Sequence, residues 1–399
     1  MAKNQPLILL GGLTPAQFLA EYWQKKPLLI KQAITDFAGL LRPEELAGLA
    51  CEDEVQARIV QQKGEKWLLK NGPFDDADFS KLPKKDWSLL VQSVNHYVPE
   101  ATDLLKQFDF IPHARLDDLM VSYAPDGGGV GPHFDSYDVF LLQGQGKRLW
   151  RISEQSDLNL VDGAPLRILK KFETSQEWLL EAGDMLYLPP KIAHWGIAVS
   201  TKNEEGDTED CMTYSIGFRA PKNHELASEF LGFMQDKLAQ EELKLTGMYQ
   251  DADLALQNHP AEISEAMIKQ VSENLQTIKW SDDLVAQFLG TYLSEPKADV
   301  IFDVNKKMTL RVFSEKLAKL GIALDLKSQM LFLNVSPNTS ISSHFFMNGE
   351  GVIVEGVAAV SLKELADTRV MNPIAIEDNR LLQQLYDWYI AGYLSFEFV

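Results

Sequence analysis

Cysteine is scarce in this sequence, and long apolar runs are missing. The chain of 399 residues has two cysteines, Cys51 and Cys211. Two isolated cysteines exclude a disulfide framework and a zinc site built from cysteine ligands. No apolar stretch reaches the roughly 18 residues that span a bilayer, and the N-terminus lacks the pattern of a signal peptide. We therefore expect a cytoplasmic enzyme or binding protein that does not enter a membrane.

Basic residues are also in short supply. Lysine and arginine together number 38, against 57 aspartates and glutamates, which gives a formal charge of −19. Such a chain repels nucleic acid and attracts cationic partners, so direct DNA binding is not expected. The alternative is that the acidity serves solubility alone. Hydrophobic residues make up 45% of the chain, which is typical of a folded globular protein.

Changes in periodicity divide the chain into parts. The first hundred residues are predicted to be mostly helical. The predicted helices are 14–25, 42–50, 86–97 and 100–105. From about residue 115, short apolar runs separated by turn residues indicate strands of an antiparallel barrel or jelly roll. The predicted strands are 119–123, 138–143, 149–152, 185–188 and 211–219. Residues 223–295 return to helical spacing, and a final helix is expected at 380–391.

A glycine-rich approach leads into the most informative segment, which contains His133 and Asp135. On a strand, side chains two residues apart project from the same face, so these two would lie together. One imidazole and one carboxylate supply two ligands of a 2-His-1-carboxylate iron site, which leaves three coordination positions open. An HxD pair by itself is weak evidence, because chance pairs are common. The strand context and a suitable second histidine strengthen it.

His194 is the best candidate for the third ligand among the seven histidines. It follows a turn, a strand and a pair of prolines, which places it beyond the end of that strand. His113 follows a proline and is interpreted as a loop residue, and the other histidines lie in regions predicted to be outside the barrel. The sequence therefore predicts that His133, Asp135 and His194 hold a metal ion.

Lys147 and Arg148 are candidates for binding a cosubstrate. Iron oxygenases with this ligand set often use 2-oxoglutarate, whose distal carboxylate needs a basic residue inside the barrel. If Gln145-Gly146 forms a two-residue hairpin turn, Gln143 pairs with Arg148, and Arg148 faces inward with the iron ligands. A three-residue turn would reverse this orientation. A solvated basic pair at a hairpin fits the spacing equally well.

Four segments together resemble the bacterial JmjC-type ribosomal oxygenases. They are residues 127–140, 146–151, 183–194 and 214–221. The resemblance covers the whole chain and implies an α+β fold with a JmjC/cupin double-stranded β-helix, or jelly roll, as its core. It also implies N-terminal helices, a helical dimerisation region and a C-terminal winged-helix-like domain. The N-terminal helical part is expected at 1–114, the JmjC/cupin core at 115–222, the helical dimerisation region at 223–296 and the winged-helix-like domain at 297–399.

The resemblance also implies roles for individual residues. The implied iron ligands are His133, Asp135 and His194, the 2-oxoglutarate contacts are Arg148 and Ser215, and the contacts to a substrate guanidinium are Asp126 and Tyr137. An acidic stretch at 201–210 departs from the family pattern. It is expected either to lengthen a loop at the barrel mouth, where its carboxylates would attract a cationic protein, or to be a solvated loop.

The implied reaction needs Fe(II), 2-oxoglutarate and O2. The bacterial branch of the family hydroxylates C3 of an arginine in the L-sixteen protein of the large ribosomal subunit. We therefore expect this reaction on a basic ribosomal protein, carried out by a homodimer. One alternative is histidyl hydroxylation of a ribosomal protein. Another is a cupin-like binding protein without catalytic activity.

Overall fold

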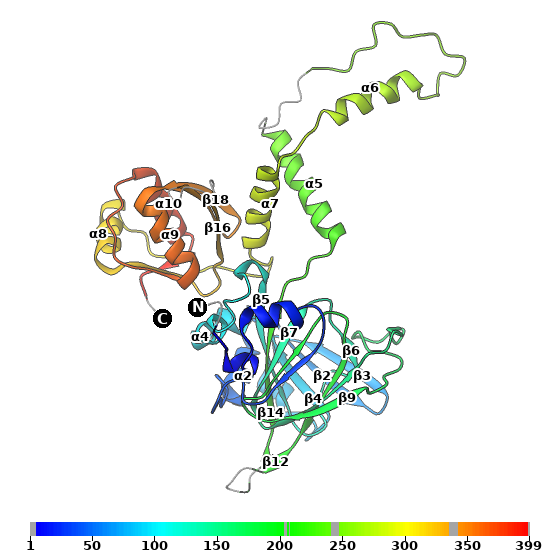
Figure 1. The fold of residues 1–399 in the computed structure, drawn as a ribbon, viewed down its shortest axis with the longest axis vertical. Coiled ribbons are helices and arrows are strands. Elements are labelled where there is room, and N and C mark those ends of the chain that lie inside the picture. Colours follow the sequence, from blue (N-terminus) through cyan, green and yellow to red (C-terminus); the bar gives the residue numbers. More distant parts are fainter. Residues whose placement is uncertain (1–4, 203–205, 207, 241–246, 335–341, 398–399) are drawn as a thin grey trace. The chain divides into compact units, whose positions relative to one another are not determined.

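The computed structural model describes residues 5–202, 206, 208–240, 247–334 and 342–397 (Figure 1). They form two compact units. The first unit comprises Met1–Ala220, Lys297–Ser328 and Pro373–Val399, and the second comprises Pro221–Pro296 and Gln329–Asn372. None of the described helices has the length and apolar character needed to cross a membrane. The predicted domain boundaries stay predictions.

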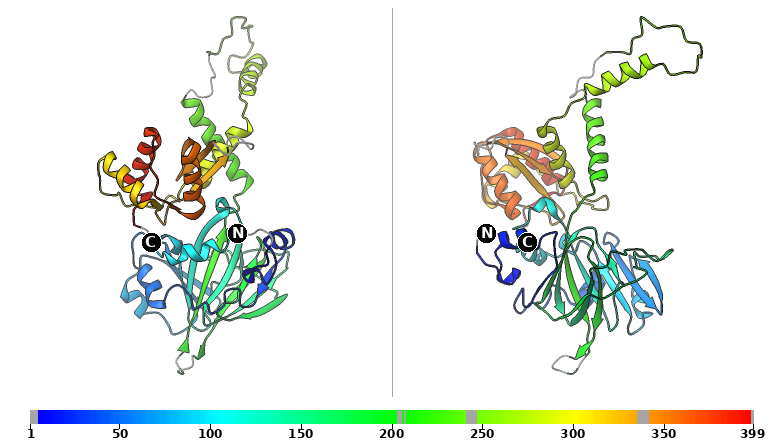
Figure 2. Two further views of the ribbon diagram at one scale, coloured as in Figure 1. Left: turned by 60° about the vertical axis from the view of Figure 1, so that its left-hand side comes forward. Right: turned by 45° about the vertical axis from the view of Figure 1, so that its right-hand side comes forward.

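Two antiparallel sheets form the centre of the first unit. The larger sheet has the strand order β1 (Leu28–Ile30), β10 (Met185–Leu188), β7 (Asp138–Gln145), β14 (Cys211–Phe218), β5 (Leu116–Ala124), β4 (Trp87–Val91), β2 (Ala57–Lys63) and β3 (Lys66–Asn71). The smaller sheet has the order β6 (His133–Phe134), β11 (Ala193–Val199), β8 (Lys147–Ser153) and β9 (Gln176–Leu180). A short hairpin of β12 (Thr201–Lys202) and β13 (Thr208–Glu209) projects from one end of the barrel (Figure 2).

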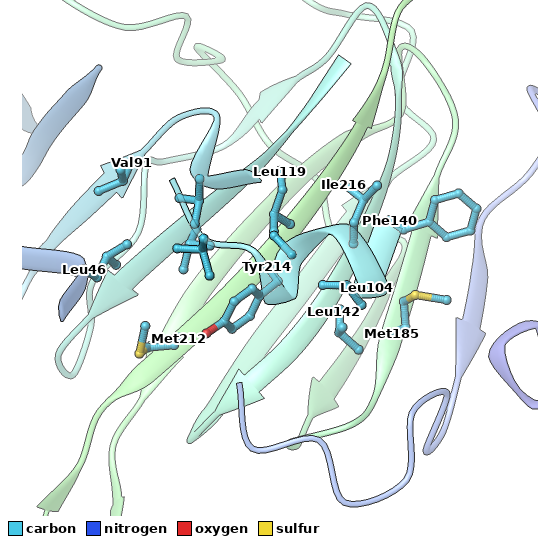
Figure 3. Packing of buried hydrophobic residues seen from close by; sticks show 14 of the residues in the cluster. Leu46, Val91, Leu104, Leu119, Phe140, Leu142, Met185, Met212, Tyr214 and Ile216 are labelled. Carbon is cyan, nitrogen blue, oxygen red and sulfur yellow. The ribbon is translucent and has the colours of Figure 1, made fainter. Parts of the chain in front are cut away.

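Helices cover the outer face of the larger sheet. They are α1 (Pro15–Glu21), α2 (Pro43–Leu49), α3 (Asp76–Ser80) and α4 (Glu100–Lys106), with single turns η1 (Ile8–Leu10), η2 (Val94–His96) and η3 (His113–Arg115). Thr14 caps α1 through a reciprocal pair of bonds with Gln17, and Pro15 occupies the first helical position. Leu46 of α2 and Leu104 of α4 pack with the outward-facing side chains of the strands (Figure 3).

A row of five paired residues, four of them polar, crosses the inner face of the larger sheet. Arg58 on β2 pairs with Leu90 on β4, and Leu90 pairs with Ser122 on β5. Ser122 pairs with Thr213 on β14, which in turn pairs with Gln143 on β7. Because paired residues on neighbouring strands share a face, this row faces the smaller sheet. Polar side chains on this inner face indicate a binding cavity instead of an ordinary core.

The prediction that the first hundred residues are mostly helical is wrong. β2, β3 and β4 lie in this region and extend the larger sheet, and residues 87–91 form a strand where a helix was predicted. All five residues of β4 are buried. A short apolar run that is buried on both faces has no period that separates a strand from a helix. The helices predicted near residues 14, 42 and 100 are present.

The predicted hairpin at Gln145-Gly146 is also wrong. β7 belongs to the larger sheet and β8 to the smaller one, so the two strands do not pair. Gly146, with a φ of 62°, makes the corner where the chain crosses between the sheets. The expected orientation of Lys147 and Arg148 nevertheless holds, since Arg148 is buried and Lys147 forms an ion pair with Glu181 near the surface.

The second unit contains helices and a three-stranded antiparallel sheet. Its elements are α5 (Asn223–Ala239), α6 (Glu265–Gln276), α7 (Asp282–Ser294), β16 (Met330–Asn334), β17 (Ser342–Met347), β18 (Glu350–Glu355), α9 (Gly356–Thr368) and β19 (Val370–Met371). The rest of the first unit consists of α8 (Leu310–Leu320), β15 (Ile322–Leu324), α10 (Asn379–Ile390) and β20 (Leu394–Ser395). The helix predicted at 380–391 is confirmed, and the helical spacing predicted for 223–295 is confirmed for α5, α6 and α7 but not for the described residues 247–264, which form no helix.

Candidate metal centre and cosubstrate pocket

His133, Asp135 and His194 come together at one end of the barrel. His133 on β6 pairs directly with His194 on β11, and their ring centroids are 4.3 Å apart. The Nε2 atom of His194 lies 3.6 Å from Oδ2 of Asp135. One ligand atom from each residue can be chosen so that all three lie within 4.8 Å of one another. This grouping matches a 2-His-1-carboxylate site.

Backbone carbonyls orient both imidazoles. Nδ1 of His133 lies 2.9 Å from O of Gly131, and Nδ1 of His194 lies 2.9 Å from O of Ile192. When Nδ1 donates to a carbonyl, the Nε2 lone pair is left free for a metal. Burial, with a smaller effect from His133, lowers the pKa of His194 to about 4. His194 is therefore neutral at physiological pH, which is the form that binds a metal.

The glycine-rich segment before His133 is required by close backbone packing. A Cβ atom on Gly128 would lie 2.1 Å from O of Trp87, and one on Gly129 would lie 2.4 Å from O of Gly196. Neither carbonyl can move without breaking the strand to which it belongs. The segment therefore runs tightly between β4 and β11 and delivers His133 to its place opposite His194.

Arg148 lies inside the barrel on the same face of the smaller sheet as His194. It pairs with Ala198, four residues along β11 from His194, so about 13 Å of strand separates their backbones. Its side chain is 4% exposed, and Nε donates to Sγ of Cys211 at 3.2 Å. Nη2 is buried, and the described residues offer it no acceptor. A buried cation with an unpartnered donor suits the distal carboxylate of a dicarboxylic acid.

A cavity of about 240 Å³ joins the metal site to Arg148. Ser215, Tyr137, Ser122 and Thr213 line it together with apolar side chains. The structure thus brings six of the seven predicted site residues to one cavity. Tyr137 is 37% exposed, and the burial of the rest of its side chain together with the carboxylates of Asp135, Asp118 and Asp117 raises its pKa, so its phenol is protonated at neutral pH.

Asp126 is the predicted site residue that the structure does not bring to the cavity. It is exposed, and its Oδ1 accepts a bond from the backbone N–H of Ser200 at 3.2 Å. Ser200 is six residues beyond His194, the partner of His133, and a strand rises about 3.3 Å per residue, so Asp126 lies on the order of 20 Å from His133. The prediction that it pairs with a substrate side chain at the iron fails for that reason.

The acidic stretch 201–210 follows the C-terminal end of β11, the end near Asp126. Glu209 and Asp210 belong to or adjoin the β12–β13 hairpin, which begins beyond Val199 and so lies away from His194. Glu204, Glu205 and Asp207 lie outside the described residues. The expectation that this stretch lengthens a loop at the barrel mouth stays a prediction, and its described part lies away from His194.

Several cavity residues were missed at the sequence level. Arg58 and Ser88 come from strands that were predicted as helix or left unassigned, and Cys211 lies at the start of a predicted strand. Gln143 accepts a bond from Thr213 at 3.0 Å and donates to Cys211 at 3.2 Å, which completes the support around Arg148. Residues 57–63 do not alternate between polar and apolar, so no period-2 signal marked the strand that carries Arg58.

Comparison with known proteins identifies the family. The "JmjC domain" family model matches residues 103–226, and the "ROXA-like winged helix" model matches residues 273–395. The Ribosomal protein uL16 3-hydroxylase of Escherichia coli is 37% identical over 284 residues, which is 71% of this chain and 72% of the relative. This chain belongs to the JmjC-type ribosomal oxygenases. The predicted family and the α+β fold with a JmjC core and a winged helix are thereby confirmed.

Solved structures of this oxygenase family match nearly the whole chain. The crystal structure of E. coli YcfD is 31% identical and covers 96% of this chain and 98% of its own, with a TM-score of 0.80. YcfD in complex with cobalt and 2-oxoglutarate is 32% identical with the same coverage and a TM-score of 0.77. Ribosomal oxygenases of the JmjC type are Fe(II)- and 2-oxoglutarate-dependent dioxygenases. The His133–Asp135–His194 group and the buried Arg148 fit both requirements.

Proposed function

We propose that this oxygenase adds a hydroxyl group to C3 of an arginine in a cytoplasmic large-subunit ribosomal protein of the uL16 type. One observation carries the proposal. The three predicted iron ligands share a cavity with Arg148, a buried cation that no carboxylate of the described residues neutralises. A metal site alone would fit many proteins, whereas a metal site beside an unpaired buried cation fits a dicarboxylate cosubstrate.

The residues of this chain have separate tasks in such a reaction. His133, Asp135 and His194 would hold Fe(II), and Arg148 would bind the distal carboxylate of 2-oxoglutarate. Bound iron and 2-oxoglutarate supply the oxidising chemistry from O2, with succinate and CO2 as the other products. Val139, Leu141 and other apolar side chains of the wall keep water out of the cavity.

The surroundings of Tyr137 favour a cationic substrate side chain. Asp135, Asp118 and Asp117 all act on the pKa of Tyr137, so this phenol lies in a negative field although Lys297 pairs with Asp117 and Asp118. A planar guanidinium can stack on the phenol ring and bond to a carboxylate while its methylene carbons face the iron. Histidyl hydroxylation is the remaining enzymatic alternative, and a cupin-like binding protein without activity is the other.

A comparison of three peptides tests this assignment. Three peptides of one sequence would carry arginine, lysine or histidine at the target position, and hydroxylation would be followed by mass together with succinate release. We expect one added oxygen on the arginine peptide with a matching amount of succinate. Hydroxylation of the histidine peptide alone would favour the alternative enzyme. No oxidation and no succinate with any peptide or with the whole ribosomal protein would favour the binding protein.

We also propose that the chain forms a homodimer through its helical segment. Ile268, Val271 and Leu275 on α6 are 55%, 41% and 60% exposed, and they recur at a spacing that places them on one helix face. An exposed apolar stripe of this kind is typical of a protein interface. The family resemblance supports a second copy of this chain as the partner.

A further inference from the structure

Arg58 lines two hollows of the first unit. One is the catalytic cavity, and the other is a larger and more open groove of about 650 Å³. Asp53, Glu54, Gln92 and Asp299 are among the residues that line the groove. Because one residue borders both spaces, the catalytic cavity and the groove adjoin each other at Arg58.

The sheet register places the groove on the metal side of Leu90, in the row that reaches Leu141 on β7. Leu90 on β4 lines the catalytic cavity, and Gln92, two residues further along the chain, lines the groove. β4 runs antiparallel to β5 with Val91 opposite Val121, and β5 runs antiparallel to β14, which in turn pairs with β7. Gln92 therefore lies towards the end at which β7 begins, and β7 begins three residues after Asp135.

Polar atoms near this junction are buried without a partner in the described structure. They are Nε of Arg58, Oγ of Ser88 and Oε1 of Gln92. Ser88 is 1% exposed and lines the catalytic cavity together with Arg58. Val60 of β2 is opposite Ser88, so Ser88 and Arg58 are diagonal neighbours on adjacent strands. A buried donor without an acceptor costs free energy, so Nε of Arg58 and Oγ of Ser88 mark this junction as incompletely satisfied by the protein itself.

Hydroxylation at C3 brings the substrate backbone into the cavity. C3 is bonded directly to the α-carbon, so the peptide groups on either side must come within a few ångströms of the metal. Each carbonyl that leaves water needs a new donor. Arg58 can give a charge-assisted hydrogen bond to such a carbonyl. It stands on the larger sheet, apart from Arg148 on the smaller one.

The groove beyond Arg58 is suited to basic side chains. Asp53 and Asp299 make no ion pair among the residues that the structure describes, and Glu54 has only Lys327 at 3.5 Å. These carboxylates outnumber the one cation of the groove lining, Arg58. Charge complementarity therefore favours a polypeptide segment with lysine or arginine.

We propose that the substrate polypeptide passes over Arg58, which donates from its guanidinium to one of the substrate's main-chain carbonyls, and continues into the acidic groove, where Asp53 and Asp299 bind basic side chains that flank the target residue. This inference rests on the proposed function, because it takes the flanking segment of a basic ribosomal protein as the occupant. Arg58 is thus a substrate-positioning residue, and the groove determines which sequences around the target are accepted.

Binding measurements separate this inference from the chemistry. The full chain would be loaded with cobalt and 2-oxoglutarate without O2, and the dissociation constants of two peptides would be measured by calorimetry. Both peptides carry the target arginine, one with flanking lysines and one with flanking serines. Arg58→Gln should weaken both about ten- to a hundredfold, the range for a charge-assisted bond. Lys63→Gln, which removes an exposed cation from the same strand, is the matched control and should change neither.

A second variant tests the groove by itself. Asp53→Asn with Asp299→Asn should weaken the lysine-flanked peptide by about two- to tenfold and leave the serine-flanked peptide unchanged. Both carboxylates are exposed, so this double variant should fold. If Arg58→Gln does not fold, Arg58→Lys replaces it as the test, because it keeps the charge of Arg58. Unchanged binding by the Arg58 variants would overturn the main-chain contact, and equal effects on both peptides would overturn the role of the groove.

The outcomes also distinguish the two proposals. If the wild-type chain binds the peptides as expected but does not oxidise them in air with iron, the proposed function fails while the proposed binding over Arg58 and in the groove stands. If it oxidises the arginine peptide but Arg58→Gln binds and turns over like wild type, only the proposed contact with Arg58 fails. If it binds neither the peptides nor the whole ribosomal protein, the proposed binding over Arg58 and in the groove is refuted.

Discussion

Replacement of Arg148 by glutamine should weaken 2-oxoglutarate binding more than any nearby change of charge. The side chain is 4% exposed, Nη2 has no acceptor among the described residues, and no carboxylate there pairs with the guanidinium. A bound carboxylate therefore gains a charge-assisted contact that water cannot replace. The loss of such a contact costs about 1.5–3 kcal/mol, which corresponds to a dissociation constant about ten to 150 times larger.

Lys147→Ala is the matched control for this experiment. Lys147 is next in sequence, but it pairs with Glu181 near the surface and does not line the cavity. The assay is the dissociation constant of 2-oxoglutarate from calorimetry, together with the rise in melting temperature on adding 2-oxoglutarate, which depends on ligand affinity. We expect the rise to be lost in Arg148→Gln and kept in Lys147→Ala. A large effect of Lys147→Ala with none of Arg148→Gln would refute the reasoning.

Three further predictions concern stability and assembly. Gly128→Ala should prevent stable folding or lower the melting temperature strongly, because its Cβ would lie 2.1 Å from O of Trp87; an unchanged melting curve would contradict the packing described. Burial raises the pKa of Asp118 above its ordinary 3.8, so the unfolded state ionises first and stability is lost as pH rises from 3.8 through the folded pKa. Asp118→Asn should remove this loss, which urea unfolding between pH 4 and 7 would measure. A variant whose stability depends on pH in the same way as that of the wild type would contradict this prediction. Ile268→Glu with Leu275→Glu should give monomers in sedimentation at micromolar concentration, while a dimer that persists would place the interface elsewhere.

The metal ligands could be predicted from the sequence because their signal is local. His133 and Asp135 are two residues apart, and few histidines compete with His194. The direct pairing of His133 with His194 is a contact between distant segments, so spacing alone could not supply it. The same limit applies to Arg148, whose inward orientation was predicted correctly from a hairpin that does not exist. Arg148 faces inward because the chain crosses from the larger to the smaller sheet at Gly146.

Elements that depend on tertiary packing were harder to predict. Residues 87–91 are apolar on both faces because they lie in the middle of the larger sheet, and such a run has no diagnostic period. Arg58 and Ser88 were missed with these strands. Asp126 looked close to the metal in sequence, but the extended path beside β11 carries it away. Distance along a strand, which a motif does not reveal, decided whether a residue near His133 reached the cavity.

The central claim is that this chain hydroxylates an arginine of a uL16-type ribosomal protein. Mass spectrometry of that protein, purified from cells that carry the wild-type gene or its Asp135→Ala variant as the only copy, tests it most directly. We expect one added oxygen on an arginine at C3 with the wild-type gene and an unmodified protein with the variant. An unmodified ribosomal protein in both strains, or an equally modified one in both, would contradict it.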